Sequence, residues 1–393
     1  MNSTRRNVGL LAACQALLMT NNATLIANNG LAGLALAPVN ALATLPVTCW
    51  VAGGAFATML ASLHMKRVGR QRGLTIGTLW GIVGALICAG AVWLQSFWLL
   101  CFGTLVFGVC NAYGQYYRFA AADVAGADFK STAISLVLAG GLVGGILGPA
   151  TSRVTVDLLS PRFTGAYLAL IGFALLTVLL LRFIRIPTPD AKVQAAHGRP
   201  LAEIAAQPKF IVAVLASAIG YGVMNFLMTS TPIAMGVCGH PYSDAAFVIS
   251  SHVIGMFAPS FVTGGLIKRI GVLPVMFAGA LLNFAAIGIA LSGFSVAQFW
   301  WSLVMLGVGW NFLYIGGTTL LTETYRPEEM AKAQGANDQT IFIVMAISSF
   351  TSGLTVTQAG WERVNLYALP LVALVVIAIG WFALVRRRAA AAA

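Results

Sequence analysis

The sequence predicts an all-α membrane protein with twelve transmembrane helices, and three observations lead to this fold class. Hydrophobic residues make up 59% of the 393 residues and charged residues only 9%, a balance that soluble domains do not have. Apolar runs of about 18 to 25 residues, long enough to cross a bilayer core as helices, recur along the whole chain. Basic residues concentrate in alternate connections between these runs.

Each apolar run is long enough to form one membrane-spanning helix. The first run lacks a small-residue cleavage site, so we expect it to be a membrane span and not a cleaved signal peptide. In chain order, the predicted spans are 8–36, 40–64, 74–94, 98–120, 131–157, 163–185, 209–236, 243–267, 273–293, 298–322, 334–358 and 364–385.

The distribution of basic residues predicts the orientation of the chain in the membrane. All but three of the 23 Lys and Arg residues fall on one side when alternate connections are counted from the N-terminus. The exceptions are Arg153, Arg162 and Arg363. Because Lys and Arg in short loops accumulate on the cytoplasmic side, both termini are predicted to be cytoplasmic. This topology accounts for the net charge of +12. We therefore expect the chain to contact the lipid bilayer and not to bind nucleic acid.

A weak internal repeat suggests that the helices form two halves. "KRVG" at 66–69 recurs as "KRIG" at 268–271, about half the chain away. The predicted organisation is an N-terminal six-helix bundle over 1–186, a cytoplasmic linker over 187–208 and a C-terminal six-helix bundle over 209–393. This organisation resembles the major facilitator superfamily, in which two halves rock around a central site. The loop "HMKRVGRQRG" at 64–73 is similar to a basic signature of that family but lacks its acidic residue.

No motif in the sequence indicates an enzyme. The 11 acidic residues lie almost entirely at helix ends or in loops, and the four His are scattered over different segments. The sequence has no nucleophile elbow, phosphate-binding glycine loop or zinc-protease helix. We therefore expect a transporter with no resident cofactor. The glycines of "LAGGLVGGILGP" at 138–149 are expected to let helices pack closely.

Two consecutive predicted helices carry soft metal ligands at the same spacing. "MNFLM" occupies 224–228 and "HVIGM" occupies 252–256, and residues four apart share one face of a helix. At about 1.5 Å per residue, Met224 and Met256 both lie about 20 Å from the outer surface, and Met228 and His252 both lie about 14 Å from it. Met235 and Cys238 extend the sulfur stripe outward if the helix continues through Pro232. Thioether and imidazole groups together favour a soft cation such as Cu(I).

The same residues also have a purely structural interpretation. Met is a flexible gap filler in packed helices, and the chain has 12 Met residues. His252 is a candidate functional residue because it is ionisable and lies within the membrane. Its alternative role is that of a neutral side chain hydrogen-bonded to a neighbouring helix. If His252 binds a metal, acidic pH should weaken uptake, because protonation of the ring competes with the metal.

The paired motifs and their context, "SHVIGMFAPSFVTGGLIKRIG" at 251–271, resemble the CcoA-like copper importers, a bacterial branch of the major facilitator superfamily. The resemblance implies copper import across the bacterial inner membrane by alternating access. It also implies a cytoplasmic copper acceptor and a role in cytochrome oxidase biogenesis. The metal-binding residues that it implies are Met224, Met228, His252, Met256, Cys49 and Cys238. Met235, on the same sulfur stripe, completes the predicted metal path.

Relatives in the same branch carry riboflavin, so a carrier of riboflavin or another organic solute is the main alternative. Such a carrier would use aromatic residues such as Trp310 and Tyr314, and its Met residues would be replaceable by Leu. Four amides of the first span are candidates either to line its cavity or to bond between helices. They are Asn21, Asn22, Asn28 and Asn29. A membrane sensor that does not transport is a third hypothesis, and it would usually carry a soluble signalling domain.

Overall fold

The computed structural model of the protein describes residues 3–39, 42–186 and 198–391. All regular elements within these ranges are helices, which confirms the predicted all-α class. Residues 187–197 of the predicted linker lie outside the described ranges. The predicted boundaries of the linker and of the two bundles therefore stay predictions.

The chain divides into two compact units, here called unit 1 and unit 2. Unit 1 consists of Met1–Ala127, Leu136–Ala196 and Gln334–Gln339. Unit 2 consists of Asp128–Ser135, His197–Ala333 and Thr340–Ala393. Each unit thus includes one short segment that is distant in sequence from the rest of that unit.

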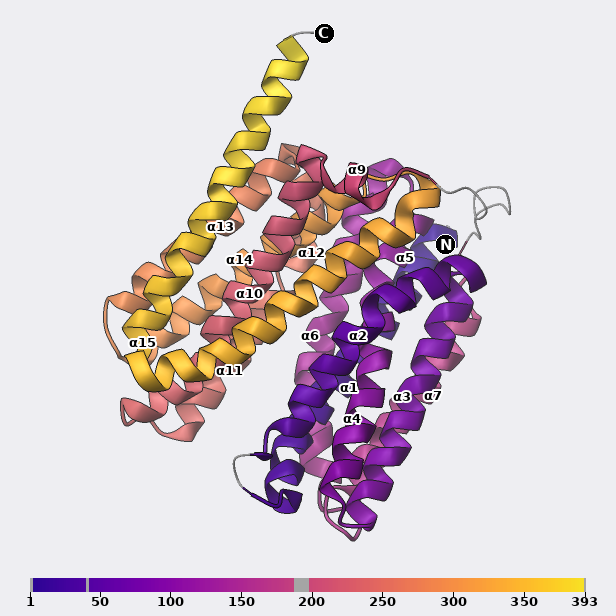
Figure 1. Ribbon diagram of the computed structural model, residues 1–393, viewed down its shortest axis with the longest axis vertical. Coiled ribbons are helices and arrows are strands. Elements are labelled where there is room, and N and C mark those ends of the chain that lie inside the picture. The colour runs from indigo at the N-terminus through magenta and orange to yellow at the C-terminus, as the bar shows by residue number, and fades with distance from the viewer. Residues whose placement is uncertain (1–2, 40–41, 187–197, 392–393) are drawn as a thin grey trace. The chain divides into compact units, whose positions relative to one another are not determined.

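Unit 1 is a bundle of long helices (Figure 1). Its elements are α1 (Ser3–Leu36), α2 (Leu45–Val68), α3 (Arg70–Trp93), α4 (Phe97–Gly114), α5 (Tyr117–Val124), most of α6 (Lys130–Thr155) and α7 (Thr164–Arg182). Helix α3 packs against α4 and α7, and α2 packs against α4. Small residues permit this close contact: a Cβ on Gly84 would lie only 2.7 Å from the backbone nitrogen of Phe107.

The glycines of α6 pack as predicted from "LAGGLVGGILGP". A Cβ on Gly144 would lie 2.6 Å from the backbone nitrogen of Thr20 on α1. Gly140 and Gly148, four residues to either side, meet the same helix at equally short range. Because no larger residue fits at these positions, this glycine stripe sets the close packing of α1 and α6.

Unit 2 is organised around α14 (Figure 1), which packs against α10, α11 and α13. Its elements are α9 (Leu201–Ala205), α10 (Pro208–Val237), α11 (Tyr242–Phe257), α12 (Ser260–Ile270), α13 (Val272–Leu291), α14 (Val296–Leu321) and α15 (Met330–Ala391) outside the segment assigned to unit 1. Two short 3₁₀ turns are Ala127–Phe129 and Pro327–Glu329.

Eleven helical stretches among the described residues are long and apolar enough to cross a membrane, compared with the twelve predicted. The difference lies in α15, whose 62 residues cover both of the last two predicted spans. Gly360 within α15 has φ 79° and ψ 174°, values outside the helical region. The helix is therefore kinked at Gly360, and its two arms correspond to the predicted spans 334–358 and 364–385.

Two predicted spans are interrupted in the structure. The predicted helix 243–267 is divided into α11 and α12 at Pro259, since Pro has no N–H to continue the helical hydrogen bonds. The predicted helix 98–120 is divided into α4 and α5 after Gly114. Each pair of helices still forms a single candidate span, so the corrections concern helix continuity and leave the number of crossings unchanged.

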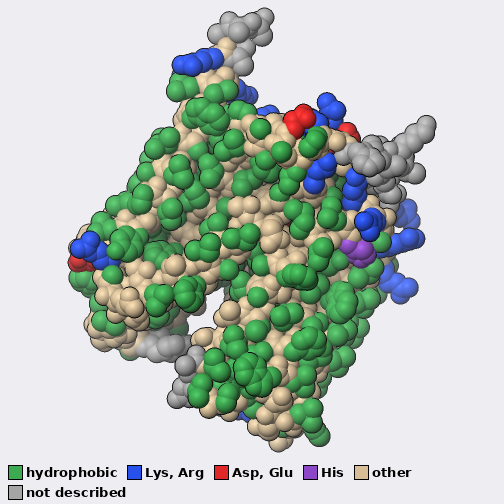
Figure 2. Space-filling model, in the orientation of Figure 1, with side chains coloured by type: hydrophobic (Ala, Val, Ile, Leu, Met, Phe, Trp, Pro, Cys, Tyr) green, Lys and Arg blue, Asp and Glu red, His purple; other side chains and the backbone are tan. Residues whose placement is uncertain are grey.

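The surface of the protein is apolar. Hydrophobic side chains cover most of the face shown in Figure 2, and the charged side chains lie mainly toward helix ends. Large exposed side chains include Phe56 and Phe350, at 75% and 73% exposure. Such a surface is unfavourable in water but matches the hydrocarbon core of a bilayer. The structure is that of a multi-pass membrane protein.

Candidate functional site

Helix α10 carries the predicted sulfur stripe, and it continues through Pro232 to Val237. The predicted stripe depended on this continuity. Met224 and Met235 are buried, whereas Met228 is half-buried. The helix therefore holds the three thioethers on one continuous element, with Met224 and Met235 withdrawn from the surface.

His252 joins α11 to α14 through a hydrogen bond. Its Nδ1 donates to the backbone carbonyl oxygen of Leu303 over 2.6 Å, since a carbonyl oxygen can only accept. The side chain is fully buried, and its Nε2 has no hydrogen-bond partner among the described residues. The two helices are very close here, because a Cβ on Gly307 would lie 2.8 Å from the backbone oxygen of His252. This contact matches the alternative role predicted for His252, a hydrogen bond to a neighbouring helix.

The remaining predicted metal ligands are dispersed. Met256 is buried in α11, while Cys238 is exposed at the C-terminal end of α10. Cys49 lies half-buried on α2 in unit 1, close to Cys101 of α4. Within the described part of the chain, no group of three or more His, Cys, Asp or Glu is arranged to hold a metal ion. Metal binding by the seven predicted residues stays a prediction.

An aromatic cluster of four residues lies between α10, α14 and the end of α11. Trp310 and Tyr314 stack on each other along α14, with ring centroids 5.0 Å apart and planes inclined by 18°. Tyr221 of α10 meets both rings edge-on, at 5.3 Å from Trp310 and 5.4 Å from Tyr314. Phe257 meets the Trp310 ring edge-on at 5.7 Å. These four residues are called the aromatic cluster below.

The aromatic cluster combines apolar rings with one unused polar group. Trp310 is 2% exposed, and its Nε1 has no hydrogen-bond partner in the described ranges. A buried N–H without a partner costs about 1–3 kcal/mol, so a ligand that accepts from it would gain from the interaction. Sequence reasoning named Trp310 and Tyr314 but missed Tyr221 and Phe257. The available signal was the position of Tyr221 on the helical face that also carries Met224 and Met228.

Unit 1 contains a cluster of amides between α1 and α4. Asn22 donates through Nδ2 to Oδ1 of Asn111 over 2.8 Å, and Gln115 donates to the same oxygen over 3.3 Å. The Oδ1 atoms of Asn21 and Asn22 are buried, and neither has a partner among the residues that the structure describes. These four residues, called the amide cluster below, therefore offer two unsatisfied acceptors.

The other two predicted amides bind neighbouring helices. Asn28 donates through Nδ2 to Oγ of Ser152 on α6 over 3.0 Å. Asn29 accepts at Oδ1 from the hydroxyl of Tyr167 on α7 over 2.8 Å. Asn22, Asn28 and Asn29 thus each bond to another helix. The Oδ1 atom of Asn28, like those of Asn21 and Asn22, is buried and has no partner among the described residues.

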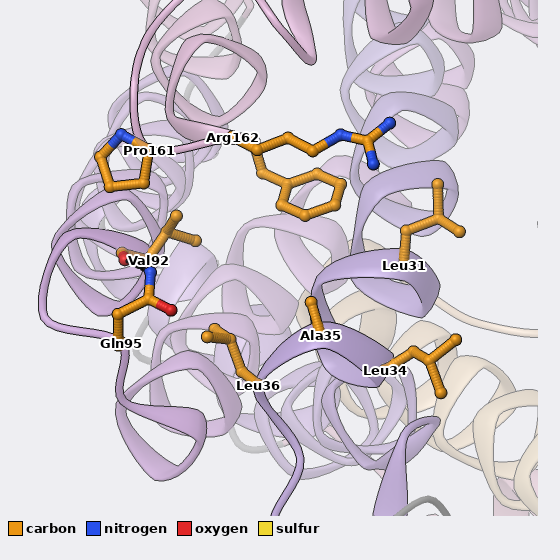
Figure 3. A pocket seen from close by; sticks show the side chains of 9 residues that line it. Leu31, Leu34, Ala35, Leu36, Val92, Gln95, Pro161 and Arg162 are labelled. Carbon is orange, nitrogen blue, oxygen red and sulfur yellow. Dashed lines mark hydrogen bonds between the residues drawn. The ribbon is translucent and has the colours of Figure 1, made fainter.

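A separate cavity of about 350 Å³ opens on unit 1 (Figure 3). It is lined by Leu31, Leu34, Ala35, Leu36, Val92, Gln95, Pro161, Arg162 and Phe163. Arg162 already pairs with the exposed Asp157, at 2.9 Å between Nε and Oδ1, and its guanidinium lies 5.2 Å from the centre of the Phe163 ring. The lining is mainly apolar and includes none of the residues predicted for a functional site.

In both units, helices long and apolar enough to span a membrane hold polar and aromatic side chains among them, an arrangement that membrane transporters share. The Major Facilitator Superfamily model matches residues 9–349 and 242–393. The chain therefore belongs to the major facilitator superfamily. This membership confirms the family resemblance drawn from the internal repeat and the span pattern.

Two bacterial proteins illustrate the similarity in sequence. Riboflavin transporter RfnT of Brucella anthropi is 42% identical over 377 residues, which cover 95% of this chain and 94% of that protein. The uncharacterized MFS-type transporter YddS of Bacillus subtilis is 29% identical over 362 residues, covering 87% of this chain and 82% of YddS.

Solved structures show the same fold at low sequence identity. The major facilitator transporter FucP superposes with a TM-score of 0.77 at 17% identity, covering 97% of this chain and 99% of FucP. The proton:xylose symporter XylE superposes with a TM-score of 0.79 at 13% identity, covering 96% of this chain and 95% of XylE. These likenesses establish the helical architecture alone.

The expectation of copper import is wrong. The 42% identical relative over 95% of the chain is a riboflavin transporter, so the resemblance to copper importers is unsupported. The copper ion, the cytoplasmic copper acceptor and the role in cytochrome oxidase biogenesis are withdrawn with it. The physical reason is that packed helices also place Met and His four residues apart, so this spacing does not by itself indicate a metal.

Proposed function

We propose that the protein is a transporter of riboflavin. The observation that carries the proposal is the aromatic cluster of unit 2, taken together with the similarity to a riboflavin transporter. Riboflavin has a flat three-ring system with two aromatic faces, a polar edge of carbonyl and N–H groups, and a chain of hydroxyls. A binding surface for it needs aromatic rings and a few uncharged polar groups.

The aromatic cluster suits the ring system of riboflavin. Aromatic rings attract one another in offset-stacked or edge-on arrangements at centroid distances of about 4.5–7 Å, the range already present among Tyr221, Trp310 and Tyr314. Stacking of a nucleobase on an aromatic side chain contributes about 1–3 kcal/mol, and the flavin ring is larger. The Trp310 Nε1 would donate to a carbonyl oxygen at the polar edge of the flavin.

The amide cluster of unit 1 suits the hydroxyl chain or the ring N–H of riboflavin. The Oδ1 atoms of Asn21 and Asn22 are buried acceptors that receive no hydrogen bond from any described residue. A hydroxyl donor would satisfy each of them, and the gain is largest for a polar group that is already buried. We propose that these amides contact riboflavin at some stage of transport, and this part can be tested independently of the aromatic cluster.

The proposed setting is the inner membrane of a bacterium, with both termini in the cytoplasm and with riboflavin moved inward. Alternating access, in which a central site faces each side in turn, is the mechanism expected for a member of this superfamily. The asymmetric distribution of Lys and Arg supports the orientation.

The experiment that tests the proposal is uptake of radiolabelled riboflavin by riboflavin-requiring bacteria that lack their own riboflavin transporter. The native chain should restore uptake, and unlabelled riboflavin should compete whereas copper should not. The variant Trp310→Leu should reduce uptake at least about tenfold through loss of stacking.

The matched control is Trp301→Leu, because Trp301 lies on the same helix and is 48% exposed. This control should transport like the native chain. A native chain that fails to restore riboflavin uptake, although it is present in the membrane at the level of the control, would contradict the proposal.

A further inference from the structure

Glu329 and Asp338 are the two acidic residues that are buried within the described ranges. Both carboxylate oxygens of Glu329 accept two hydrogen bonds each. Its Oε1 accepts from the backbone nitrogen and Nε of Arg199, both at 2.8 Å, and its Oε2 accepts from Nη2 of Arg199 at 2.7 Å and from the Arg326 nitrogen at 3.0 Å. The hydrogen bonds to Glu329 raise the pKa of Arg199. Both oxygens of Glu329 are therefore used in fixed hydrogen bonds, which gives this residue a structural role.

Asp338 differs from Glu329 because only one of its two carboxylate oxygens accepts hydrogen bonds from the described residues. Its Oδ1 accepts from Nη2 of Arg118 at 2.5 Å and from Nδ2 of Asn337 at 2.7 Å. Its Oδ2 is buried and has no hydrogen-bond partner among the described residues. Asp338 lies within the candidate membrane span Pro327–Arg388 and is 2% exposed. An ionisable group at such a position is a candidate for ion or proton transfer.

Arg118 is held in place by contacts that do not involve Asp338. Its Nη1 donates to the backbone oxygen of Gln115 over 2.6 Å, and its guanidinium carbon lies 4.4 Å from the centre of the Phe119 ring. Because these contacts belong to the α4–α5 region, Arg118 would keep its position if the carboxylate of Asp338 lost its charge. It is a fixed counter-ion for a carboxylate carried on another helix.

The segment Gln334–Gln339 of α15 packs tightly within unit 1. A Cβ on Gly335 would lie 2.6 Å from the sulfur of Met59 on α2, and Gln334 accepts a hydrogen bond from Arg70 on α3. Arg70 also pairs with Asp123 at 3.0 Å. The charged and titratable groups on the surrounding elements include Arg70 on α3, Arg118, Asp123 and Tyr117 on α5, Tyr113 on α4, Tyr116 between α4 and α5, and His64 and Lys66 on α2.

We propose that Asp338 is the proton-binding residue that couples riboflavin transport to a proton gradient, with Arg118 as its counter-ion. This proposal rests on the proposed function. Riboflavin is uncharged near neutral pH, so its accumulation against a gradient requires a coupled ion. A proton from water on one side of the membrane binds Oδ2 of Asp338 and converts the carboxylate into a neutral carboxyl group. The same proton later leaves to water on the other side and restores the carboxylate.

Proton binding and the Arg118–Asp338 contact are linked. A neutral carboxyl group no longer attracts the guanidinium, so protonation weakens the contact that ties Gln334–Gln339 to α5. Conversely, separation of the two side chains removes a positive charge from beside Asp338 and thereby favours the neutral carboxyl group. By this reciprocity, proton binding at Asp338 shifts the equilibrium between two arrangements of the segment.

The test uses the full-length protein in sealed vesicles and compares two modes of transport. In the first mode, external radiolabelled riboflavin exchanges with internal riboflavin without a pH difference. In the second mode, an inward proton gradient of one pH unit drives accumulation, which reaches about tenfold for one proton per riboflavin. The variant Asp338→Asn, which mimics the protonated side chain, should retain exchange and should not accumulate riboflavin above the external concentration.

The matched control is Asp157→Asn, because Asp157 also pairs with an Arg at 2.9 Å but is 70% exposed. It should show native behaviour in both modes. Accumulation by Asp338→Asn equal to that of the native chain would overturn the proposal. A native chain that exchanges riboflavin but ignores the pH gradient would also overturn it, whereas a native chain that exchanges no riboflavin would contradict the proposed function itself.

If Asp338→Asn loses exchange as well, the variant Asp338→Glu decides the question. Glu keeps a titratable group but displaces it by one methylene from Arg118, so the pH dependence of gradient-driven uptake should shift. A pH dependence identical to that of the native chain would overturn the assignment of the proton to this residue.

Discussion

Helix α10 presents two sets of side chains that differ in what surrounds them. Met224 and Met228 have a spacing typical of soft-metal ligands, and His252 on α11, predicted to join them, donates from Nδ1 to the backbone of α14. Tyr221, one helical turn before Met224, instead contacts the stacked pair Trp310 and Tyr314. Met224 is buried and Met228 half-buried, whereas the rings form an ordered surface with an unused N–H.

The difference between these two sets shows why spacing alone is weak evidence for a site. A four-residue spacing places two side chains on one face of a helix, and packing uses such faces as readily as ligand binding does. The geometry of the partner element adds the missing information. On α14, glycine and a backbone carbonyl face His252, while two stacked rings face Tyr221.

The largest effect is expected from removal of both stacked rings. The double variant Trp310→Leu/Tyr314→Leu should reduce riboflavin uptake to the background of cells without the transporter, because both aromatic faces and the Trp310 N–H are lost. Uptake of radiolabelled riboflavin checks this, with the amount of folded protein in the membrane measured in parallel. Substantial uptake by a folded double variant would place the flavin elsewhere.

A smaller effect is expected from Asn21→Leu. Loss of one hydrogen bond to the solute should weaken the apparent affinity for riboflavin by about three- to tenfold, while thermal stability stays close to that of the native chain. The comparison variant is Asn29→Leu, which removes the acceptor for Tyr167 and should lower stability instead. Concentration-dependent uptake and melting in detergent separate the two. An unchanged affinity in Asn21→Leu would remove this residue from the proposed binding surface.

His252→Leu should act on stability and not on transport. Loss of the hydrogen bond to Leu303 should lower the free energy of unfolding by about 1 kcal/mol, with riboflavin affinity unchanged. The midpoint of thermal unfolding in detergent and the KM for uptake measure the two effects. A strong loss of affinity without loss of stability would show that His252 contacts the solute.

The smallest effect is expected from the double variant Met224→Leu/Met228→Leu. Met-to-Leu changes conserve volume and usually cost less than about 1.5 kcal/mol, so riboflavin uptake should remain within about twofold of native. Abolished uptake by the folded variant would mean that the thioethers take part in transport. The Met side chains, and not only the aromatic rings, would then belong to the transport site.

Much of the fold could be predicted from the sequence because the signals are local. The length and hydropathy of each apolar run depend on neighbouring residues only, and the glycine stripe on α6 follows from the spacing of Gly140, Gly144 and Gly148. The break at Pro259 was not predicted, because a Pro does not always end a helix, as α10 shows by continuing through Pro232. For the kink at Gly360, the sequence predicted only a gap between the spans 334–358 and 364–385.

The candidate sites could be predicted less well because they depend on contacts between distant residues. Arg118 and Asp338 are 220 positions apart, and the sequence gives no indication that they meet. Phe257 could not be distinguished from other apolar residues without knowledge of which helix it faces, and the signal for Tyr221 was limited to its place on the helical face of Met224 and Met228. Trp310 and Tyr314 were predictable as a pair, because four residues on a helix bring two rings together.

The most direct test of the aromatic cluster as the flavin-binding surface is titration of purified protein in detergent with riboflavin, following flavin fluorescence. Stacking of the flavin on Trp310 should quench its fluorescence in a saturable manner in the native chain and in Trp301→Leu. The variant Trp310→Leu should show no saturable quenching at the same concentrations. Identical quenching curves for native protein and Trp310→Leu would contradict the account.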